Sequence, residues 1–274
     1  MNPQKYAITF ACYNQVEYTK KCVASMVKNG LELSRLVVID NGSKDDTRSY
    51  LETLSLGGRI FNQANLGCGV AWNQGALALQ AEWTIIMNND VIVSRNWIEN
   101  LIETAEKNNL KVISPSLIEG LLDYDFEDFS TRASAKMHSA MRLNGRHAVC
   151  LAVHQSVWLE VGYFQPIPKL LGYEDTMFFN ELDKANIATG ITGASWLHHY
   201  GSITQSAMKQ ERGLSEKDNL GYRFNYHLLK QSWLTRKLNK AMKVRQEKQW
   251  RKNELSQFGL SMHGLRANGE FVWN

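Results

Sequence analysis

Two carboxylates stand where short apolar runs of the chain give way to polar residues. Asp90 ends the stretch Glu-Trp-Thr-Ile-Ile-Met-Asn-Asn-Asp over residues 82–90, and Asp40 follows the run Leu-Val-Val-Ile over residues 36–39. Such runs are typical of buried strands, and open α/β sheets hold ligands at the carboxyl ends of their strands. A carboxylate there can bind a divalent cation, which in turn can neutralise a diphosphate. A turn or helix cap after a core strand explains Asn-Asn-Asp equally well when it is taken alone.

A third run, Tyr6 to Ala11, includes Thr9 and Phe10 and ends at Cys12-Tyr13-Asn14-Gln15. It adds an aromatic ring and amides to the same edge of the predicted sheet. Such an edge suits a nucleotide, because a ring can stack on a base and a carboxylate can accept from a base or ribose donor.

Three further segments carry polar groups at the ends of expected elements. Residues 65–75, Asn-Leu-Gly-Cys-Gly-Val-Ala-Trp-Asn-Gln-Gly, form a glycine-rich entry into a helix, which a close helix–sheet contact also explains. Glu174-Asp175 begins a helix, where the dipole alone favours acids. His198-His199 follows a strand and could supply an imidazole to a metal, although such pairs are more often structural.

The elements that must position these groups alternate along the first hundred residues. We expect strands at 6–11, 35–40, 59–61 and 83–88, and helices at 15–29, 45–55, 68–80 and 94–108. This alternation predicts βαβ units and a mostly parallel sheet flanked by helices, which is an α/β, Rossmann-like fold.

The second half of the chain is less regular. After a strand at 111–115, the acidic stretch 119–132 is interpreted as a mobile loop and not as a metal cluster. The pattern then predicts a strand at 147–153, a helix at 154–161, a Pro/Gly-rich loop at 162–172, a helix at 175–186 and a strand ending near Leu197.

The C-terminal part is basic and helical. Residues 220–252 read as one or two amphipathic helices, with Trp233, Leu234, Leu238, Ala241 and Met242 on one side. Nine basic residues between 230 and 252 oppose only Glu247, so this segment carries +8 in a chain of net charge +4. Its apolar side could pack on the body or attach to an anionic membrane, and the sequence favours neither.

The composition is that of an ordinary globular protein, with 274 residues and 44% hydrophobic content. Four widely spaced cysteines indicate reduced thiols rather than zinc ligands or disulfides. No signal-peptide pattern and no apolar run of about 18 residues is present, so we expect a cytoplasmic location, with peripheral contact at the inner face of the cell membrane as an option.

Taken in order, these segments resemble family 2 glycosyltransferases with the GT-A fold, of the type that builds bacterial surface polysaccharides such as O-antigen or capsule. The resemblance covers about residues 5–205 and divides the chain into a catalytic domain, 1–205, and a helical extension, 206–274. It rests on seven segments: Tyr13-Asn14, Asp40-Asn41-Gly42-Ser43, Asn65-Leu66-Gly67 with Asn73-Gln74-Gly75, Asn88-Asn89-Asp90, Val161-Gly162-Tyr163-Phe164, Tyr173-Glu174-Asp175 and His198-His199-Tyr200-Gly201-Ser202. Asn88 stands where the first acid of the usual Asp-x-Asp occurs.

The resemblance implies an inverting, metal-dependent transfer of a sugar from a nucleotide diphosphate, UDP- or dTDP-linked, to a hydroxyl of a glycan or lipid-linked glycan. Asp175 would be the general base, with Glu174 orienting it or the acceptor. Asp90 and either His199 or His198 would bind Mn²⁺ or Mg²⁺. The nucleotide-sugar contacts would come from Thr9, Phe10, Tyr13, Asn14, Asp40, Asn65, Gly67, Asn73, Asn88 and Asn89. No nucleic-acid partner is expected.

Two other functions compete with this interpretation. A sugar-nucleotide nucleotidyltransferase shares the βαβ start, but it would need a glycine-rich loop with a basic residue after the first strand, and residues 9–15 have neither. A non-catalytic scaffold beside the membrane would explain the basic tail. The joint presence of Asp40, Asp90 and Asp175 argues against the scaffold.

Overall fold

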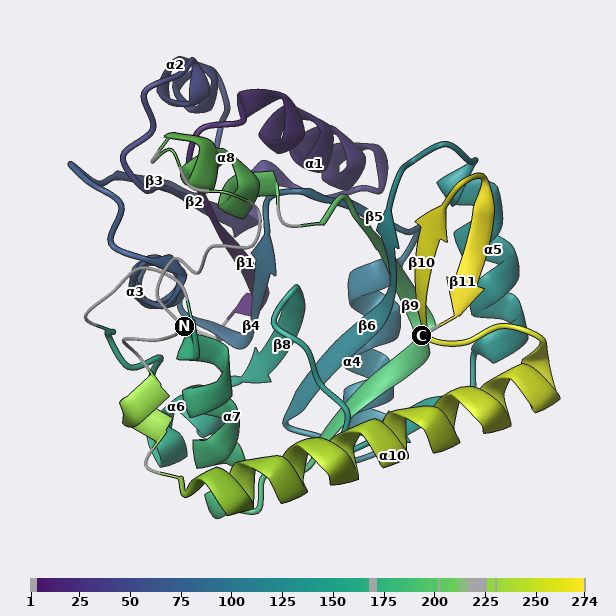
Figure 1. The fold of residues 1–274 in the computed structure, drawn as a ribbon. Helices are drawn as coiled ribbons and strands as arrows, with labels where there is room; N and C mark the ends of the chain where they lie inside the picture. The colour runs from purple at the N-terminus through teal and green to yellow at the C-terminus, as the bar shows by residue number, and fades with distance from the viewer. Residues whose placement is uncertain are drawn as a thin grey trace.

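A computed structural model describes residues 4–167, 172–201, 203–211, 213, 215, 226–229 and 231–273. Parts of three predicted features lie outside these residues: positions 168–171 of the Pro/Gly-rich loop, Ser202, and positions 220–225 and 230 of the basic segment. The predicted α/β class, with helices flanking one mixed sheet, is confirmed (Figure 1).

The first hundred residues form the expected alternation of strands and helices. The bounds are β1 Gln4–Cys12, α1 Val16–Lys28, β2 Leu36–Asp40, α2 Thr47–Glu52, β3 Gly58–Phe61, α3 Cys68–Ala78, β4 Ala81–Asn88, β5 Val91–Val93 and α4 Trp97–Lys107. Strands β4, β1, β2 and β3 are neighbours in that order and all parallel. Their carboxyl ends therefore meet at one edge of the sheet, as the βαβ pattern requires.

The second half completes the sheet with mixed pairing. Its bounds are β6 Val112–Gly120, α5 Phe126–Met137, β7 Met141–Leu143, β8 Cys150–His154, α6 Gln155–Val161, α7 Glu174–Lys184, β9 Thr189–His199 and α8 Ile203–Glu211. Strand β8 lies antiparallel between β4 and β6, and β9 pairs parallel with β6 and antiparallel with β5.

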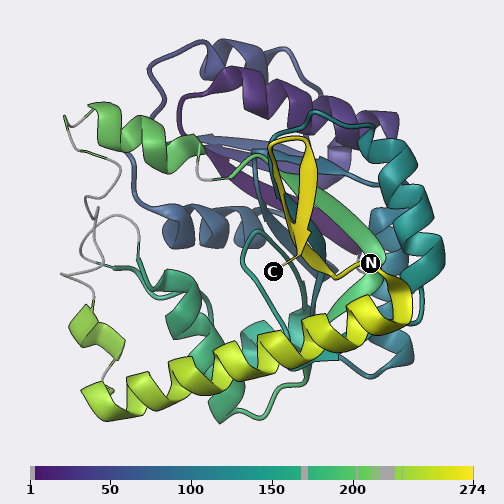
Figure 2. The same ribbon diagram turned by 45° about the vertical axis from the view of Figure 1, so that its right-hand side comes forward.

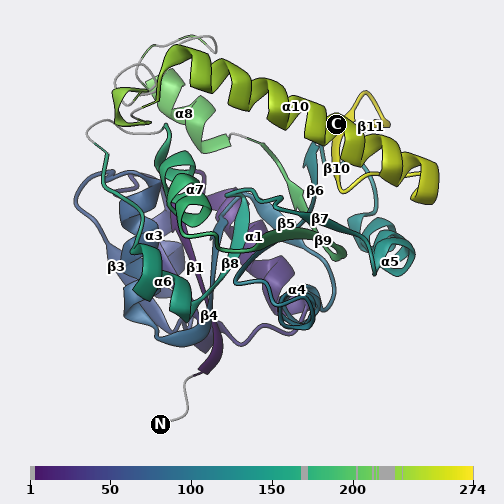
Figure 3. The same cartoon turned by 90° about the horizontal axis from the view of Figure 1, so that it is seen from below.

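Apolar side chains cover both faces of the sheet, since alternate residues of a strand point in opposite directions. Ile8 and Phe10 pack with α1 and α4 on one face, whereas Ile86 packs with α3, α6 and α7 on the other. Figure 3 shows this division, with α3, α6 and α7 together on one side of β1 and β4. Helix α3 lies especially close to β1, because a Cβ on Gly75 would stand 1.7 Å from Thr9 Oγ1.

The prediction of a mobile loop over residues 119–132 was wrong. Glu119 lies on β6, and residues 126–137 form helix α5, which Asp125 caps by accepting from the Asp128 N–H at 3.0 Å. Phe126, Ala133 and Met137 fall on one side of this helix and are buried in a cluster with Trp196. The acidic residues on its other side concealed that helical stripe.

A long helix and a hairpin end the described chain. Helix α10, Trp233–Phe258, runs along the body, and β10 His263–Ala267 then pairs in parallel with β6 and antiparallel with β11 Glu270–Trp273 (Figure 2). The hairpin was not predicted, although Asn268-Gly269 at its turn is a recognised hairpin signal and both residues have positive φ. The extension therefore contributes strands to the central sheet as well as a helix.

The first half of α10 does not bury its apolar residues. Trp233, Leu234, Leu238 and Met242 are all more than half exposed. The contact with the body comes instead from the second half, where Glu254 is buried and Phe258 packs on the cluster around Trp196. Among the helices in the described ranges, none combines the length and the apolar character needed to cross a bilayer.

Candidate active site

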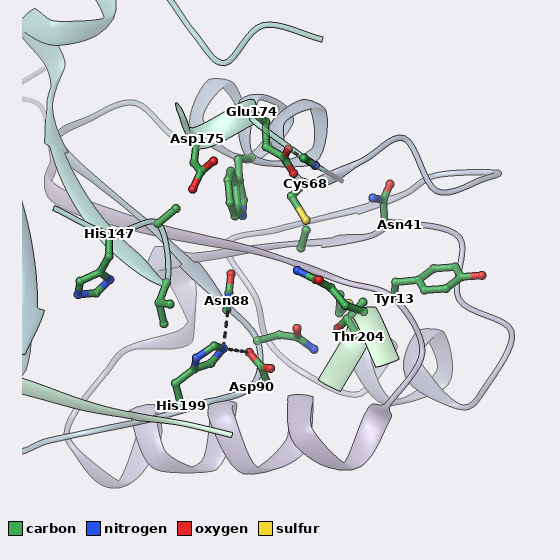
Figure 4. A pocket seen from close by; sticks show the side chains of 18 of the residues that line it. Tyr13, Asn41, Cys68, Asn88, Asp90, His147, Glu174, Asp175, His199 and Thr204 are labelled. Carbon is green, nitrogen blue, oxygen red and sulfur yellow. Dashed lines mark hydrogen bonds and ion pairs between the residues drawn. The ribbon is translucent and has the colours of Figure 1, made fainter. Parts of the chain in front are cut away.

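The carboxyl ends of β1, β4 and β9 open into a cavity of about 380 Å³. The first turns of α3 and α7 form its opposite wall, and α8 adds Thr204, Gln205 and Met208 (Figure 4). Segments separated by more than a hundred residues thus meet here because parallel strands end at one edge of the sheet.

Asp90 and His199 face one another in this cavity. Val91 pairs with His199 across the β5–β9 ladder, which brings the His199 Nε2 atom to 3.2 Å from Asp90 Oδ1 (Figure 4). The Asn88 Nδ2 atom is 3.4 Å from the same imidazole nitrogen. Both side chains of the Asp90–His199 pair are less than a tenth exposed. A carboxylate and an imidazole are therefore aimed at one point beside the cavity.

The two neighbouring histidines point to opposite faces of β9, as successive residues of a strand do. His198 is fully buried, and its Nδ1 lies 3.0 Å from the hydroxyl of Tyr124, away from the cavity. Burial lowers the pKa of His198 to about 4, so the ring is neutral. The structure brings His199, and not His198, to Asp90.

The Asp90–His199 pair fits a divalent cation that obtains its other ligands from a diphosphate. Within the described part of the chain, no three His, Cys, Asp or Glu side chains form a site that could hold a metal by themselves. Mg²⁺ and Mn²⁺ are commonly held by one or two protein ligands together with substrate phosphates. Burial favours the neutral His199 ring, but Asp90 and Glu119 outweigh it and raise its pKa to about 9. A proton and a metal would therefore compete for this imidazole.

Glu174 and Asp175 begin α7 on the opposite wall of the cavity. Glu174 is buried and accepts from the Gly172 N–H at 2.7 Å, and burial raises the pKa of its carboxyl. Among the described residues, Asp175 accepts only from its own helix, from the Thr176 N–H at 2.7 Å and the Thr176 hydroxyl at 3.3 Å. Both acids line the cavity, and Asp175 is the less buried of the two, whereas Glu174 is tied to Gly172.

An amide network closes the end of the cavity beside β2. Asn41 donates to Asn65 Oδ1 at 2.9 Å and to the Gly67 carbonyl at 3.3 Å, and it accepts from the Leu66 N–H. Asn41 and Asn65 line the cavity. Gly67 has φ 87°, which lets the chain turn into α3.

Helix α8 covers the outer part of this end. The Glu211 carboxylate accepts from the Tyr13 hydroxyl at 2.9 Å and from Asn14 Nδ2 at 2.6 Å. Tyr13 lines the cavity, whereas Asn14 lines a separate, more open hollow with Glu211. The described structure therefore presents both predicted nucleotide contacts already bonded to α8.

The other predicted contacts differ in how close they come to the cavity. Asn89 lines it and donates to Thr19 Oγ1 at 2.8 Å. Asp40 is buried just beyond it and accepts from the Ser43 N–H at 2.9 Å. Asn73 exchanges two hydrogen bonds with the backbone of Phe164. Thr9 and Phe10 lie inside the sheet, and the structure does not bring their side chains to the cavity.

Several lining residues were missed by the sequence analysis. Asn41 directly follows Asp40, and Trp72 lies within the glycine-rich segment, so both stood next to residues that were selected. Arg146, His147 and Lys243 follow no strand-end pattern, and only long-range packing brings them to the cavity. Cys68 also lines it, but burial raises the pKa of its thiol to about 12, so it is not a nucleophile at neutral pH.

Comparison with known proteins identifies the family of this chain. The family model described as Glycosyl transferase family 2 matches residues 8–165, which include the second half of β1 and all of β2 and β4, with Asp40 and Asp90. The chain belongs to glycosyltransferase family 2. Asp175 and His199 lie beyond the matched residues, and the fold brings them to the same cavity as Asp90.

Curated relatives in this family are similar over part of the chain. An uncharacterized glycosyltransferase of Rickettsia conorii is 30% identical over 103 residues, 37% of this chain and 17% of its own length. One from Haemophilus influenzae is 29% identical over 121 residues, 43% of this chain and 38% of its own. The glycosyltransferase GlyG of Streptococcus pneumoniae is 25% identical over 126 residues, 44% of this chain and 40% of its own. The matches thus span less than half the length of these relatives.

A solved structure has a similar fold. The crystal structure of GalNAc-T7 with UDP, GalNAc and Mn²⁺ matches this family 2 chain with a TM-score of 0.56 and 15% sequence identity, over 72% of this chain and 44% of that one. At this identity the similarity concerns the fold, which confirms the predicted GT-A architecture.

Proposed function

We propose that this protein is an inverting, metal-dependent glycosyltransferase that transfers a sugar from a nucleotide diphosphate to a hydroxyl of a glycan or lipid-linked glycan. The observation that carries the proposal is the meeting of Asp90, His199 and Asp175 in one cavity at the strand ends of a family 2 fold. The fold neighbour solved with UDP, GalNAc and Mn²⁺ supports a nucleotide donor, for which UDP- or dTDP-linked sugars are our candidates.

The donor's diphosphate would lie beside Asp90 and His199. These two residues would hold Mn²⁺ or Mg²⁺, which when bound supplies positive charge against the departing diphosphate. The nucleotide would extend toward Asn41 and Asn65, whose amides offer donors and acceptors to a base or ribose. Tyr13 is placed to cover it once Glu211 releases the tyrosine hydroxyl.

Asp175 would act as general base across the cavity. It would take the proton of the acceptor hydroxyl as that oxygen bonds to the anomeric carbon and the bond to the diphosphate breaks. A direct, in-line displacement of this kind inverts the anomeric centre. A carboxylate is a weak base for an alcohol, so proton transfer and attack would be concerted.

The acceptor would approach along a second hollow between α7 and α10. This groove has a volume of about 940 Å³ and shares Arg146, His147, Tyr173, Phe179 and Lys243 with the donor cavity. Thr176 lines the groove, and its neighbour Asp175 lines the cavity. A chain lying in the groove would therefore present its end to the proposed base.

The exposed start of α10 suits a peripheral position on the cytoplasmic face of a membrane. Trp233, Leu234 and Leu238 stand in solvent beside basic residues, and Lys237 lies 5.1 Å from the Trp233 ring. An apolar stripe flanked by cations is the usual design of helices that lie on anionic lipid. A lipid-linked acceptor would then be delivered to the groove that α10 borders.

A panel of nucleotide sugars tests the proposal. A donor that binds the folded protein raises its melting temperature by mass action, so the cognate nucleotide should be the strongest stabiliser, and only with Mn²⁺ or Mg²⁺. Slow hydrolysis of that donor should follow when no acceptor is present. A protein that shows neither metal-dependent stabilisation nor hydrolysis with any donor would instead support the scaffold.

A further inference from the structure

Glu119 lies between two histidines that come from opposite sides of β6. Its Oε1 atom is 3.1 Å from His199 Nδ1, and its Oε2 atom is 3.0 Å from His263 Nε2. His199 ends β9 and His263 begins β10, and both strands pair with β6. With Asp90, these side chains form a row of four that starts in the cavity and ends on the C-terminal hairpin.

The chemistry of this row determines which nitrogen of the His199 ring carries a hydrogen. A carboxylate only accepts hydrogen bonds, so His199 Nδ1 must carry a hydrogen and donate it to Glu119. In the neutral ring, Nε2 is then the atom with a free lone pair, and it is Nε2 that faces Asp90. On its other side the carboxylate faces His263, whose Nε2 lies 3.0 Å from Oε2, so an imidazole holds each oxygen of Glu119.

We propose that Glu119 and His263 are positioning residues for the metal-binding imidazole. Glu119 selects the tautomer of His199 and makes it a stronger ligand, as carboxylates behind zinc-bound histidines do. His263 holds the second oxygen of Glu119 and so keeps the carboxylate turned toward His199. The proposal rests on the proposed metal dependence. It also assigns a role in the site to the hairpin β10–β11, which lies outside the family match at residues 8–165.

Measuring the Mn²⁺ affinity of the full chain tests the proposal without an assay of sugar transfer. Mn²⁺ binding would be titrated by electron paramagnetic resonance, with Mn²⁺ alone and with Mn²⁺ and UDP. Glu119→Ala should weaken binding by roughly 10- to 100-fold, the usual effect of removing a group that supports a metal ligand. His263→Ala should weaken it less, and His263→Gln should recover binding, because its amide can still donate to Glu119.

Arg266→Ala is the matched control. Arg266 lies on the same strand, β10, but its side chain pairs with Asp123 at 2.6 Å and lies over the rings of Tyr124 and Phe271. It should leave Mn²⁺ affinity unchanged, while melting in EDTA shows whether each variant is folded. His263 is more than a third exposed, so its replacement leaves no core cavity.

Two results overturn the inference in different ways. A wild-type protein that binds no Mn²⁺ removes the metal dependence together with the role of Glu119. The positioning role alone is removed if the wild type binds Mn²⁺ and both Glu119→Ala and His263→Ala keep its affinity within about twofold. The same conclusion follows if Arg266→Ala lowers the affinity as much as His263→Ala does.

Discussion

Arg142 of β7 and Glu254 of α10 form a two-pronged ion pair inside the protein, with Nε–Oε1 and Nη2–Oε2 distances of 2.7 and 2.8 Å. Both side chains are less than a tenth exposed. Glu254 Oε2 also accepts from the Ser261 hydroxyl at 2.7 Å and the Met262 N–H at 3.0 Å. One carboxylate therefore ties the long helix to the body and to the start of the last hairpin.

Replacing one member of this pair should cost much stability. Glu254→Ala leaves a buried guanidinium without its counter-charge, and we expect the free energy of unfolding in urea to fall by about 3–5 kcal/mol. The double variant Arg142→Met, Glu254→Leu should recover much of that loss, since it removes both charges. Asp128→Ala, which breaks the exposed pair with Arg132, is the control and should cost less than about 1 kcal/mol. Equal losses for the buried and exposed pairs would contradict the anchoring role.

Asp90→Ala should abolish transfer and weaken Mn²⁺-dependent binding of the donor nucleotide. The side chain lines the cavity, and the His199 ring, unlike a guanidinium, can give up its proton once its counter-charge is removed, so we expect the variant to stay folded, which melting in EDTA checks. Calorimetric titration of UDP with and without Mn²⁺ measures the effect. Metal-dependent affinity equal to that of the wild type would remove Asp90 from the metal site.

Asp175→Asn should separate catalysis from donor binding. The amide has the size of the carboxylate but cannot take a proton, so turnover should fall by about 10²-fold or more while nucleotide affinity stays near wild type. Glu174→Gln serves as the comparison, because Glu174 is hydrogen bonded to Gly172 and less available as a base. Activity of Asp175→Asn within a few-fold of wild type would move the base to Glu174.

Affinity for the metal should depend on pH. Below its pKa of about 9, the His199 ring is protonated in the metal-free protein, and binding through Nε2 must expel that proton. Mg²⁺ affinity in the presence of UDP should therefore rise as the pH increases from 7 to 9, by up to about tenfold per unit, and level off above. Calorimetry in buffers of different ionisation enthalpy would count the released proton. A pH-independent affinity with no proton release would exclude His199 as the ligand.

The start of α10 should bind vesicles that contain acidic lipid. Each basic residue near an anionic surface contributes about 1 kcal/mol, and salt screens this attraction. Co-sedimentation should be strong at low salt and weak at high salt, and Leu234→Glu with Leu238→Glu should abolish it. Leu159→Glu, at a leucine on α6 that is still more exposed, is the control and should pellet like wild type. Absence of pelleting at low salt would eliminate the membrane role.

The meeting of Asp90 and His199 could be anticipated because both follow strands that end at one edge of the sheet, whereas Asp175, at a helix start, was expected there only from the family resemblance. The choice between His198 and His199 could not, since it depends on the register of β9 against β5. Thr9 and Phe10 were predicted as nucleotide contacts because they come shortly before the end of their strand, but both side chains are buried on the covered faces of the sheet. Local pattern gives the end of a strand more reliably than the direction of each side chain on it.

Features that depend on distant pairing were the hardest to predict. Glu119 lies in an acidic stretch whose spacing matches no pattern of metal ligands. Its proposed role depends on the strands that pair with β6 on either side of it. The packing of α10 through Glu254 rather than through Leu234 and Leu238 likewise depends on where Arg142 lies in the fold.

Glu211 would act as a tethered competitor of the proposed nucleotide. Its carboxylate occupies the Tyr13 hydroxyl and the Asn14 amide, and α8 keeps it there at a high local concentration. A molecule that needs those two donors must first displace it. The free energy needed to release α8 therefore raises the apparent dissociation constant of such a molecule. A variant without this carboxylate would bind the molecule more tightly with no new contact.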